Sequence, residues 1–162
     1  MTLNDHTATG RFSVEGIPKP QPRPRAFVRG RHASVYNPDS ADEWKAAVRE
    51  MAIKFAPPRP WKGPVAMDLA LWLPRPKRLK VAGASDYDAH DGTPDVDNLA
   101  KAVLDAMSDC GWWLDDRQVS SLTAKKYWAM APKGPAGTWW TGATVQVWPV
   151  HRSILDAASP GK

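Results

Sequence analysis

Cysteine is nearly absent from this 162-residue sequence, and long apolar runs are missing altogether. The one cysteine, Cys110, cannot form an internal disulfide or build a zinc site alone, so a reducing, cytoplasmic setting is expected. No stretch approaches the roughly 18 apolar residues that a membrane-spanning helix needs, which excludes a transmembrane protein. The first ten residues are polar and lack the apolar centre of a signal peptide, which argues against secretion.

Proline and tryptophan, in contrast, are abundant, with 16 and nine residues. The prolines predict short elements, and the tryptophans must be buried or lie where another group stacks on them. The chain length predicts one domain, and a hydrophobic content of 43% is typical of a globular protein. We expect a flexible N-terminus over residues 1–10, one domain over 11–150 and a C-terminal tail over 151–162.

Charge is distributed unevenly along the chain. Residues 1–80 contain 15 Lys and Arg against 7 Asp and Glu, whereas residues 81–162 contain 7 against 10. Nine aspartates and a single cation, Lys101, lie between Asp86 and Asp116. An acidic cluster in a basic protein fits a site that holds divalent cations against a bound polyanion, and it also fits a solvated acidic loop. Composition leaves both interpretations open.

Hydrophobic periodicity predicts a small sheet and two principal helices. A helix is expected from Asn37, as N-cap, to Phe55, and a second from Asp97 to about Gly111. The two helices and the strands together predict an α+β fold: one domain with a small mixed or antiparallel sheet of three to five strands packed against two main helices. The expected strands are residues 11–17, 65–73, 119–128 and 143–150, with a short hairpin at 26–36.

Two basic segments, residues 19–31 and 75–80, are candidates for contact with phosphate. In the first, proline occupies every second position from Pro18 to Pro24, which keeps the chain extended, and no acid lies between Lys19 and Arg31. A solvated basic loop and a proline-rich ligand for a partner domain are the alternatives. The candidate DNA-binding residues are Lys19, Arg23, Arg25, Arg29, Arg31, Arg75, Lys77, Arg78, Lys80 and Lys125.

The most informative constellation begins after Pro94, with Asp95 and Asp97. In an extended segment, side chains two residues apart point the same way, so these carboxylates can converge on one cation. Asp97 also stands at an expected N-cap. From there Asp97, Lys101 and Asp105 follow one helical face.

A second acidic pair, Asp115 and Asp116, follows that helix, and the chain could return there beside the first pair. Carboxylates without thiolates are hard oxygen ligands, which favours Mg²⁺ or Mn²⁺ over zinc. Such a site beside phosphate suits metal-assisted hydrolysis of a phosphodiester. The alternative is structural: Asp97 only a cap, Asp105 only an ion-pair partner of Lys101, and Asp115 and Asp116 only a turn.

The acidic stretch from Asp86 to Gly92 is not an EF-hand, because its glycine falls one place late and no helix precedes it. We expect Asp86, Asp88 and Asp91 to lie in a solvated loop. His90 alone indicates nothing about function.

The motif Pro94-Asp-Val-Asp-Asn-Leu-Ala-Lys-Ala-Val-Leu-Asp-Ala, followed by Trp113-Leu-Asp-Asp-Arg-Gln-Val, closely resembles the RusA family of Holliday junction resolvases. The resemblance implies a homodimeric, Mg²⁺-dependent endonuclease of a kind common in phages and prophages. By the same resemblance, Asp95, Asp97 and Asp116 are the catalytic carboxylates and metal ligands. Lys101 contacts the scissile phosphate or orients the nucleophile, and Asp105 and Asp115 are supporting residues.

The function expected from residues and resemblance together is resolution of four-way DNA junctions by paired symmetric nicks. Mg²⁺ is the expected cofactor, with Mn²⁺ as a substitute, and a second copy of the chain is the expected partner. Two alternatives stay open: a nuclease for other branched DNA, and a junction-binding module without catalysis.

Overall fold

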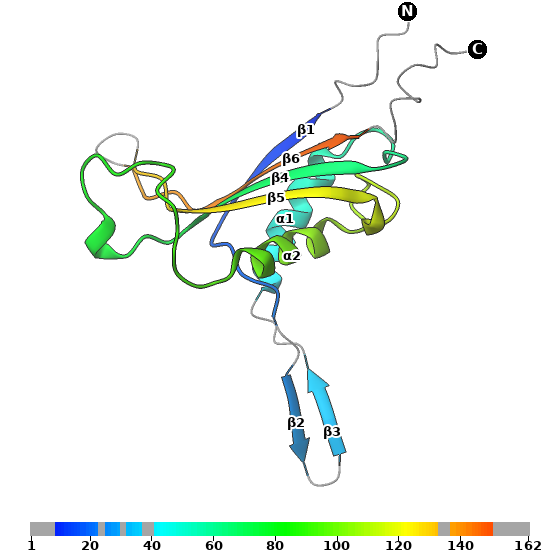
Figure 1. The fold of residues 1–162 in the computed structure, drawn as a ribbon, viewed down its shortest axis with the longest axis horizontal. Helices are drawn as coiled ribbons and strands as arrows, with labels where there is room; N and C mark the ends of the chain where they lie inside the picture. The colour runs from blue at the N-terminus through cyan, green and yellow to red at the C-terminus, as the bar shows by residue number, and fades with distance from the viewer. Residues whose placement is uncertain (1–8, 23–24, 30–31, 37–40, 133–136, 151–162) are drawn as a thin grey trace, which may run out of the picture.

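The computed structural model describes residues 9–22, 25–29, 32–36, 41–132 and 137–150 (Figure 1). The predicted C-terminal tail and nearly all of the predicted flexible N-terminus lie outside these residues. Among the described helices, none is long and apolar enough to cross a membrane.

A four-stranded mixed sheet forms the centre of the fold, in the order β1-β6-β4-β5. β1 pairs antiparallel with β6 and β6 antiparallel with β4, whereas β4 and β5 are parallel. A parallel pair needs a crossover connection, and the chain between β4 and β5 contains α2. The strands are β1 (Gly10–Glu15), β4 (Val65–Leu73), β5 (Val119–Trp128) and β6 (Gly142–Pro149).

Two helices, α1 (Asp42–Phe55) and α2 (Val96–Met107), cover one face of this sheet (Figure 1). The predicted α+β fold with two main helices is therefore confirmed. α1 begins later than predicted: Ala41 is the N-cap rather than Asn37, and the acids Asp42 and Glu43 in the first turn suit the positive end of the helix.

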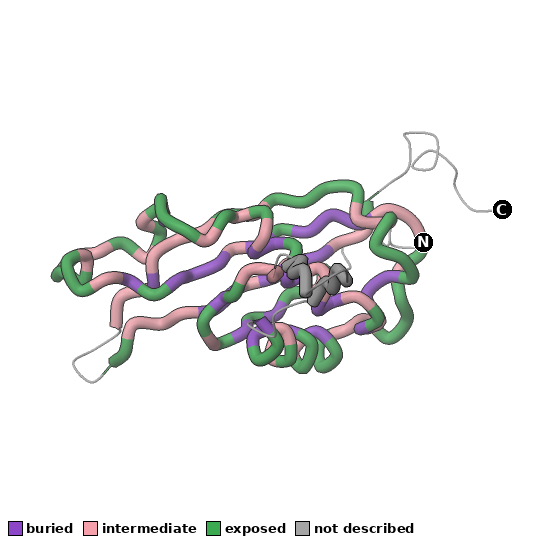
Figure 2. The backbone as a smooth tube through the Cα atoms, turned by 90° about the horizontal axis from the view of Figure 1, so that it is seen from below, coloured by how far each residue is buried: buried purple, intermediate pink, exposed green. Residues whose placement is uncertain are grey.

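The core lies between the helices and the sheet. Alternate residues of β4, such as Met67, Leu69 and Leu71, face the helices and are at most 2% exposed. Leu99 and Val103 of α2 are fully buried against them. Each such side chain contributes about 1.5–3 kcal/mol through burial, so this stripe fixes which face of α2 remains outside. Figure 2 shows the buried residues along the central strands.

The predicted hairpin is also confirmed. β2 (Arg25–Arg29) and β3 (His32–Tyr36) pair antiparallel as a separate two-stranded sheet. This hairpin projects away from the central sheet (Figure 1). The loops that follow β4 and β5 lie together at one end of the central sheet (Figure 1).

Candidate functional site

Asp95 and Asp97 lie at the N-terminal end of α2, and both are exposed. Asp95 occupies the N-cap position with extended backbone, and its carbonyl accepts the Leu99 N–H at 3.1 Å. Asp97 is therefore in the first turn rather than at the N-cap, which corrects the sequence expectation. The pair spans the start of the helix instead of sharing one extended segment, because the helix begins at Val96.

The predicted polar face of α2 is present. Asp97 and Lys101 are exposed, Asp105 is partly exposed, and all three lie opposite the buried stripe. Asp105 pairs with Lys45 of α1, with 3.9 Å between Nζ and Oδ2. Its ion-pair partner is thus on the neighbouring helix, whereas the sequence suggested Lys101. Lys101 stands one turn beyond Asp97 on a surface open to solvent.

Asp116 lies at the opposite end of α2. Its carboxylate accepts hydrogen bonds from Ser108 Oγ at 2.7 Å and from Trp113 Nε1 at 2.8 Å. Ser108 is the C-cap of α2, 11 residues after Asp97, a separation of about 16 Å along the helix axis. Among the described residues, no three His, Cys, Asp or Glu side chains are grouped so that they could hold a metal ion.

The expected return of the second acidic pair beside the first is therefore wrong within one chain. A short connection over residues 108–115 leads from α2 into the 3₁₀ helix η3 (Asp116–Gln118), and β5 follows directly. Ser108 and the buried Trp113 hold Asp116 where that turn begins. The spacing of the acids in the sequence does not reveal the position of Asp116, because that position depends on where Trp113 is buried.

Asp115 is occupied with the turn itself. Its side chain caps η3 by accepting the Arg117 N–H at 2.8 Å, and it forms a two-point ion pair with the Arg117 guanidinium. The guanidinium hydrogen bonds, followed by the backbone bond, hold the pKa of Asp115 below its ordinary value. These contacts make Asp115 a structural residue of the turn.

The comparison with protein families decides the identity of this constellation. The family model for endodeoxyribonuclease RusA matches residues 15–134, which include both acidic pairs and Lys101. The chain belongs to the RusA family. It is also 31% identical over 129 residues to the uncharacterized protein YqaN of Bacillus subtilis (strain 168), covering 76% of this chain and 90% of that protein. The resemblance drawn from the motif is confirmed.

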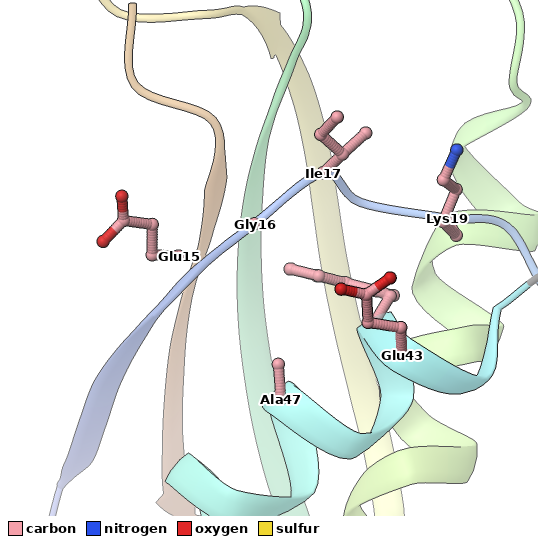
Figure 3. Close-up of a pocket in the computed structure, with 7 residues that line it drawn as sticks. Glu15, Gly16, Ile17, Lys19, Glu43 and Ala47 are labelled. Atoms are coloured by element: carbon pink, nitrogen blue, oxygen red, sulfur yellow. The ribbon is translucent and has the colours of Figure 1, made fainter. Parts of the chain in front are cut away.

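RusA proteins are endodeoxyribonucleases that act on branched DNA junctions. In this RusA chain, phosphate contacts are therefore expected on the surface around α2. The first basic segment does pass there: the Gln21 N–H donates to the Asn98 carbonyl at 2.9 Å. Figure 3 shows Lys19 beside a recess whose lining also includes Glu15 and Glu43. The two acids make the recess itself unsuited to phosphate, whereas Lys19 is exposed next to α2.

The arginines of this first segment are Arg23, Arg25, Arg29 and Arg31. Arg23 and Arg31 lie outside the described residues, and only the backbone of Arg25 and Arg29 is described, in β2. In the second segment, residues 75–80, the exposed cations lie in the 3₁₀ helix η2 (Lys77–Leu79) or directly after it. They are Lys77, Arg78 and Lys80.

Arg75 is a correction to the predicted DNA-binding set. It is 5% exposed and donates to the carbonyls of Leu79, Ser85 and Ala129. It also forms an ion pair with Asp88 at 2.8 Å. The guanidinium therefore ties the loops at the end of the sheet together and does not face DNA. Its buried position could not be read from a run of basic residues.

The same contacts correct the expectation of a solvated acidic loop. Asp88 is the partner of Arg75, and Asp86 accepts the Ala131 N–H at 3.0 Å. Only Asp91 of the three is exposed. Asp86 and Asp88 support the loop structure, because their carboxylates accept hydrogen bonds from buried or partly buried donors.

Lys125 lies on the wrong side of the sheet for the α2 surface. It pairs in register with Ala70, on the face opposite the buried Leu69 and Leu71, whereas α2 covers the face of Leu69 and Leu71. We therefore leave Lys125 out of the proposed interface. The neighbouring Lys126, which the sequence did not single out, is on the α2 face.

His90 is a second residue that sequence reasoning passed over. It is 7% exposed, its ring lies 3.9 Å from the Trp128 ring centroid, and its Nδ1 accepts the Gly92 N–H at 3.1 Å. Burial, followed by the positive charge of Lys126, lowers the pKa of His90 below its ordinary 6.5. The neutral ring therefore supports the loop that leads to Asp95.

We expect this histidine to make folding stability depend on pH. Because the unfolded state takes up the proton first, the free energy of unfolding falls as pH drops through 6.5 and levels off below the folded pKa. The slope is at most about 1.4 kcal/mol per pH unit for one proton. His90→Asn keeps an acceptor near Gly92 without the titration. Urea unfolding at pH 7.5, 6.5 and 5.5 should show a smaller loss for the variant; equal losses would contradict the assignment.

Proposed function

We propose that this RusA-family protein is a divalent-metal-dependent endonuclease that resolves four-way DNA junctions by paired nicks. The observation that carries the proposal is the exposed start of α2, where Asp95 is the N-cap and Asp97 stands one turn before Lys101. These residues belong to the stretch that the RusA family model matches. The substrate is DNA, so we propose the cytoplasm as the place of action.

The residues at the start of α2 fit a hard cation. Mg²⁺ keeps several waters and is held by a small number of carboxylates together with substrate phosphates, so two exposed aspartates beside a phosphate suit the part of the site that one chain supplies. Asp95 and Asp97 would hold the ion, and Mn²⁺ would substitute because it takes the same ligands. When bound, the ion supplies an activated water and stabilises charge on the attacked phosphate.

Lys101 supplies positive charge on the same exposed face. Four residues after Asp97, its ammonium faces solvent and can reach a phosphate docked at the start of the helix. A lysine there offsets the negative charge that develops in the transition state. The proline-rich segment, which contacts α2 through Gln21, adds the positive charge of Lys19 near this face. The hairpin β2–β3, which continues the first basic segment, projects away from the central sheet (Figure 1).

We propose a homodimer, because symmetric nicks on two strands need two sites related by a two-fold axis. The position of Asp116 suggests how the dimer is used. A two-fold axis that crosses α2 near its middle places the Asp116 end of one helix beside the Asp95 end of the other. In that arrangement the third carboxylate of each site comes from the partner chain, and one chain alone has an incomplete site.

Cleavage of a synthetic four-way junction with Mg²⁺ and with EDTA is the direct test. We expect metal-dependent nicks at symmetry-related positions in opposite strands, and a dimer of about 36 kDa by sedimentation equilibrium, twice the chain mass. Binding without nicking would favour the non-catalytic junction-binding module. Equal cleavage of flaps and three-way branches by a monomer would favour the nuclease for other branched DNA.

A further prediction concerns the first basic segment, in which Arg25 is the first residue of β2. Replacing Arg23 and Arg25 together by alanine should weaken junction binding and reduce the slope of log K against log salt concentration. Each lost phosphate contact lowers that slope by about one unit, so two lost contacts lower it by about two. Fluorescence anisotropy between 50 and 200 mM NaCl with Ca²⁺ in place of Mg²⁺ measures the slope.

The matched control removes two exposed cations elsewhere, Arg11 on β1 and Lys54 near the end of α1. This control should keep the slope of the unmodified protein. An unchanged slope in the Arg23 and Arg25 variant would show that the segment is a solvated basic loop.

A further inference from the structure

Lys126 binds the loop that leads into α2. It pairs in register with Leu71 of β4, so its side chain lies on the face of the sheet that the helices cover. Its Nζ donates to the Pro94 carbonyl at 2.9 Å and also to the Gly92 carbonyl. Gly92 and Pro94 lie outside the helices and strands, so their carbonyls are not part of a regular backbone hydrogen-bond pattern. The ammonium of Lys126 supplies the donor for both.

The same strand holds the loop at earlier points. The His90 N–H donates to the Lys126 carbonyl at 3.2 Å, and the Trp128 N–H donates to the Asp88 carbonyl at 2.9 Å. The rings of His90 and Trp128, tilted by 36° with their centroids 3.9 Å apart, add a contact between side chains. The loop is therefore docked along the end of β5, and Lys126 makes the last of these bonds before the helix starts.

The bond to Pro94 acts directly on Asp95. The Pro94 carbonyl belongs to the planar peptide whose nitrogen is that of Asp95, so holding the oxygen fixes the orientation of that plane. On its other side, the Asp95 carbonyl accepts the Leu99 N–H. The backbone of Asp95 is thus held at both of its peptide groups, which limits the directions that its carboxylate can take.

We propose that Lys126 is a positioning residue for the metal-binding pair Asp95 and Asp97. It acts through the Pro94 carbonyl, without touching DNA or the metal. The inference rests on the proposed function of that pair. A positioning role separates Lys126 from a phosphate-binding lysine, whose loss weakens DNA binding, and from a purely structural lysine, whose loss lowers stability alone.

Three variants separate these roles. Lys126→Met keeps the aliphatic chain and removes the donor, and Lys126→Arg returns donors at the same place. Lys125→Met removes the same charge from the next residue, on the opposite face of the sheet. Supporting residues around a metal site typically contribute 10–100-fold in metal affinity, so we expect Lys126→Met to need about tenfold more Mg²⁺ for half-maximal cleavage. Lys126→Arg should recover part of that loss, and Lys125→Met should match the unmodified protein.

Two measurements without cleavage accompany the metal titration. Mn²⁺ binding to the free protein, followed by electron paramagnetic resonance, should weaken in Lys126→Met by the same factor. Hydrogen exchange of the amides of residues 95–98 should speed up by about tenfold in the metal-free variant, because the start of α2 opens more easily. Junction affinity in Ca²⁺ should stay within about twofold of the unmodified value, since no phosphate contact is lost.

The outcomes are distinct. An unchanged metal requirement with unchanged exchange at residues 95–98 would overturn the proposal, and so would a loss of junction affinity that accounts for the whole defect. If Lys126→Met melts below the assay temperature, Lys126→Arg decides. At full thermal stability, a partial loss of metal affinity with faster exchange at residues 95–98 supports positioning, whereas unmodified metal affinity with unmodified exchange contradicts it. If the unmodified protein binds Mn²⁺ but never cuts DNA, the proposed endonuclease function is wrong. The comparison of Mn²⁺ binding between the unmodified protein and Lys126→Met still tests the positioning role.

Discussion

Asp97→Asn should abolish metal-dependent cleavage of a four-way junction while leaving the fold and junction binding intact. The substitution removes one negative charge from the metal-binding pair and keeps the size of the side chain. Losing several kcal/mol of metal-assisted charge stabilisation lowers the cleavage rate by at least about 100-fold. Single-turnover cleavage with excess protein measures the rate, and binding in Ca²⁺ measures affinity separately.

Asp68→Asn is the matched control. Asp68 is also an exposed aspartate, but it lies in β4 on the face opposite the core residues Met67 and Leu69, away from α2. Its loss should leave cleavage near the unmodified rate. Stability of the Asp97 variant should fall by at most about 1 kcal/mol, the usual contribution of an acid in the first turn of a helix. Near-normal cleavage by Asp97→Asn would refute its assignment as a metal ligand.

Mixing two inactive proteins, Asp97→Asn and Asp116→Asn, should restore nicking. If each site takes Asp97 from one chain and Asp116 from the other, a mixed dimer contains one intact site and one site that lacks both carboxylates. Half of randomly paired dimers are mixed, so nicking should return to about a quarter of the unmodified rate. The products should be single nicks rather than paired ones, because only one site per dimer is intact.

The measurement uses subunits exchanged by mild denaturation and refolding, with each variant alone treated in the same way. A mixture as inactive as its components would show that both carboxylates act within one chain or that the dimer does not form. An active Asp116→Asn protein would remove Asp116 from the site altogether. Ser108→Ala is a milder companion, since it removes one of the two donors that hold the Asp116 carboxylate.

Local pattern accounts for much of the fold and for half of the candidate site. The alternation in β4 and the apolar stripe of α2 each depend on neighbours within a few residues, so the strand, the helix and its exposed face followed from periodicity. Asp97 and Lys101 share that face because they are four residues apart. The helix boundary did not follow in the same way: Asp95 rather than Asp97 is the N-cap, and aspartate is favoured at that position in either place.

The sequence by itself determined the α+β class, the acidic and basic residues of the α2 face and membership of the RusA family, because each is written in short-range spacing. Only the tertiary structure decided where Asp116 lies, that Arg75 is buried and that Lys126 holds the Pro94 carbonyl. Arg75 and Lys126 bond to residues far apart in the chain, through the parallel pairing of β4 with β5 and the loops folded over its end. Asp116 is held by its near neighbours Ser108 and Trp113, but its separation from Asp97 depends on the length of α2 and on where Trp113 packs. Such contacts are set by packing of the whole domain, and no local periodicity encodes them.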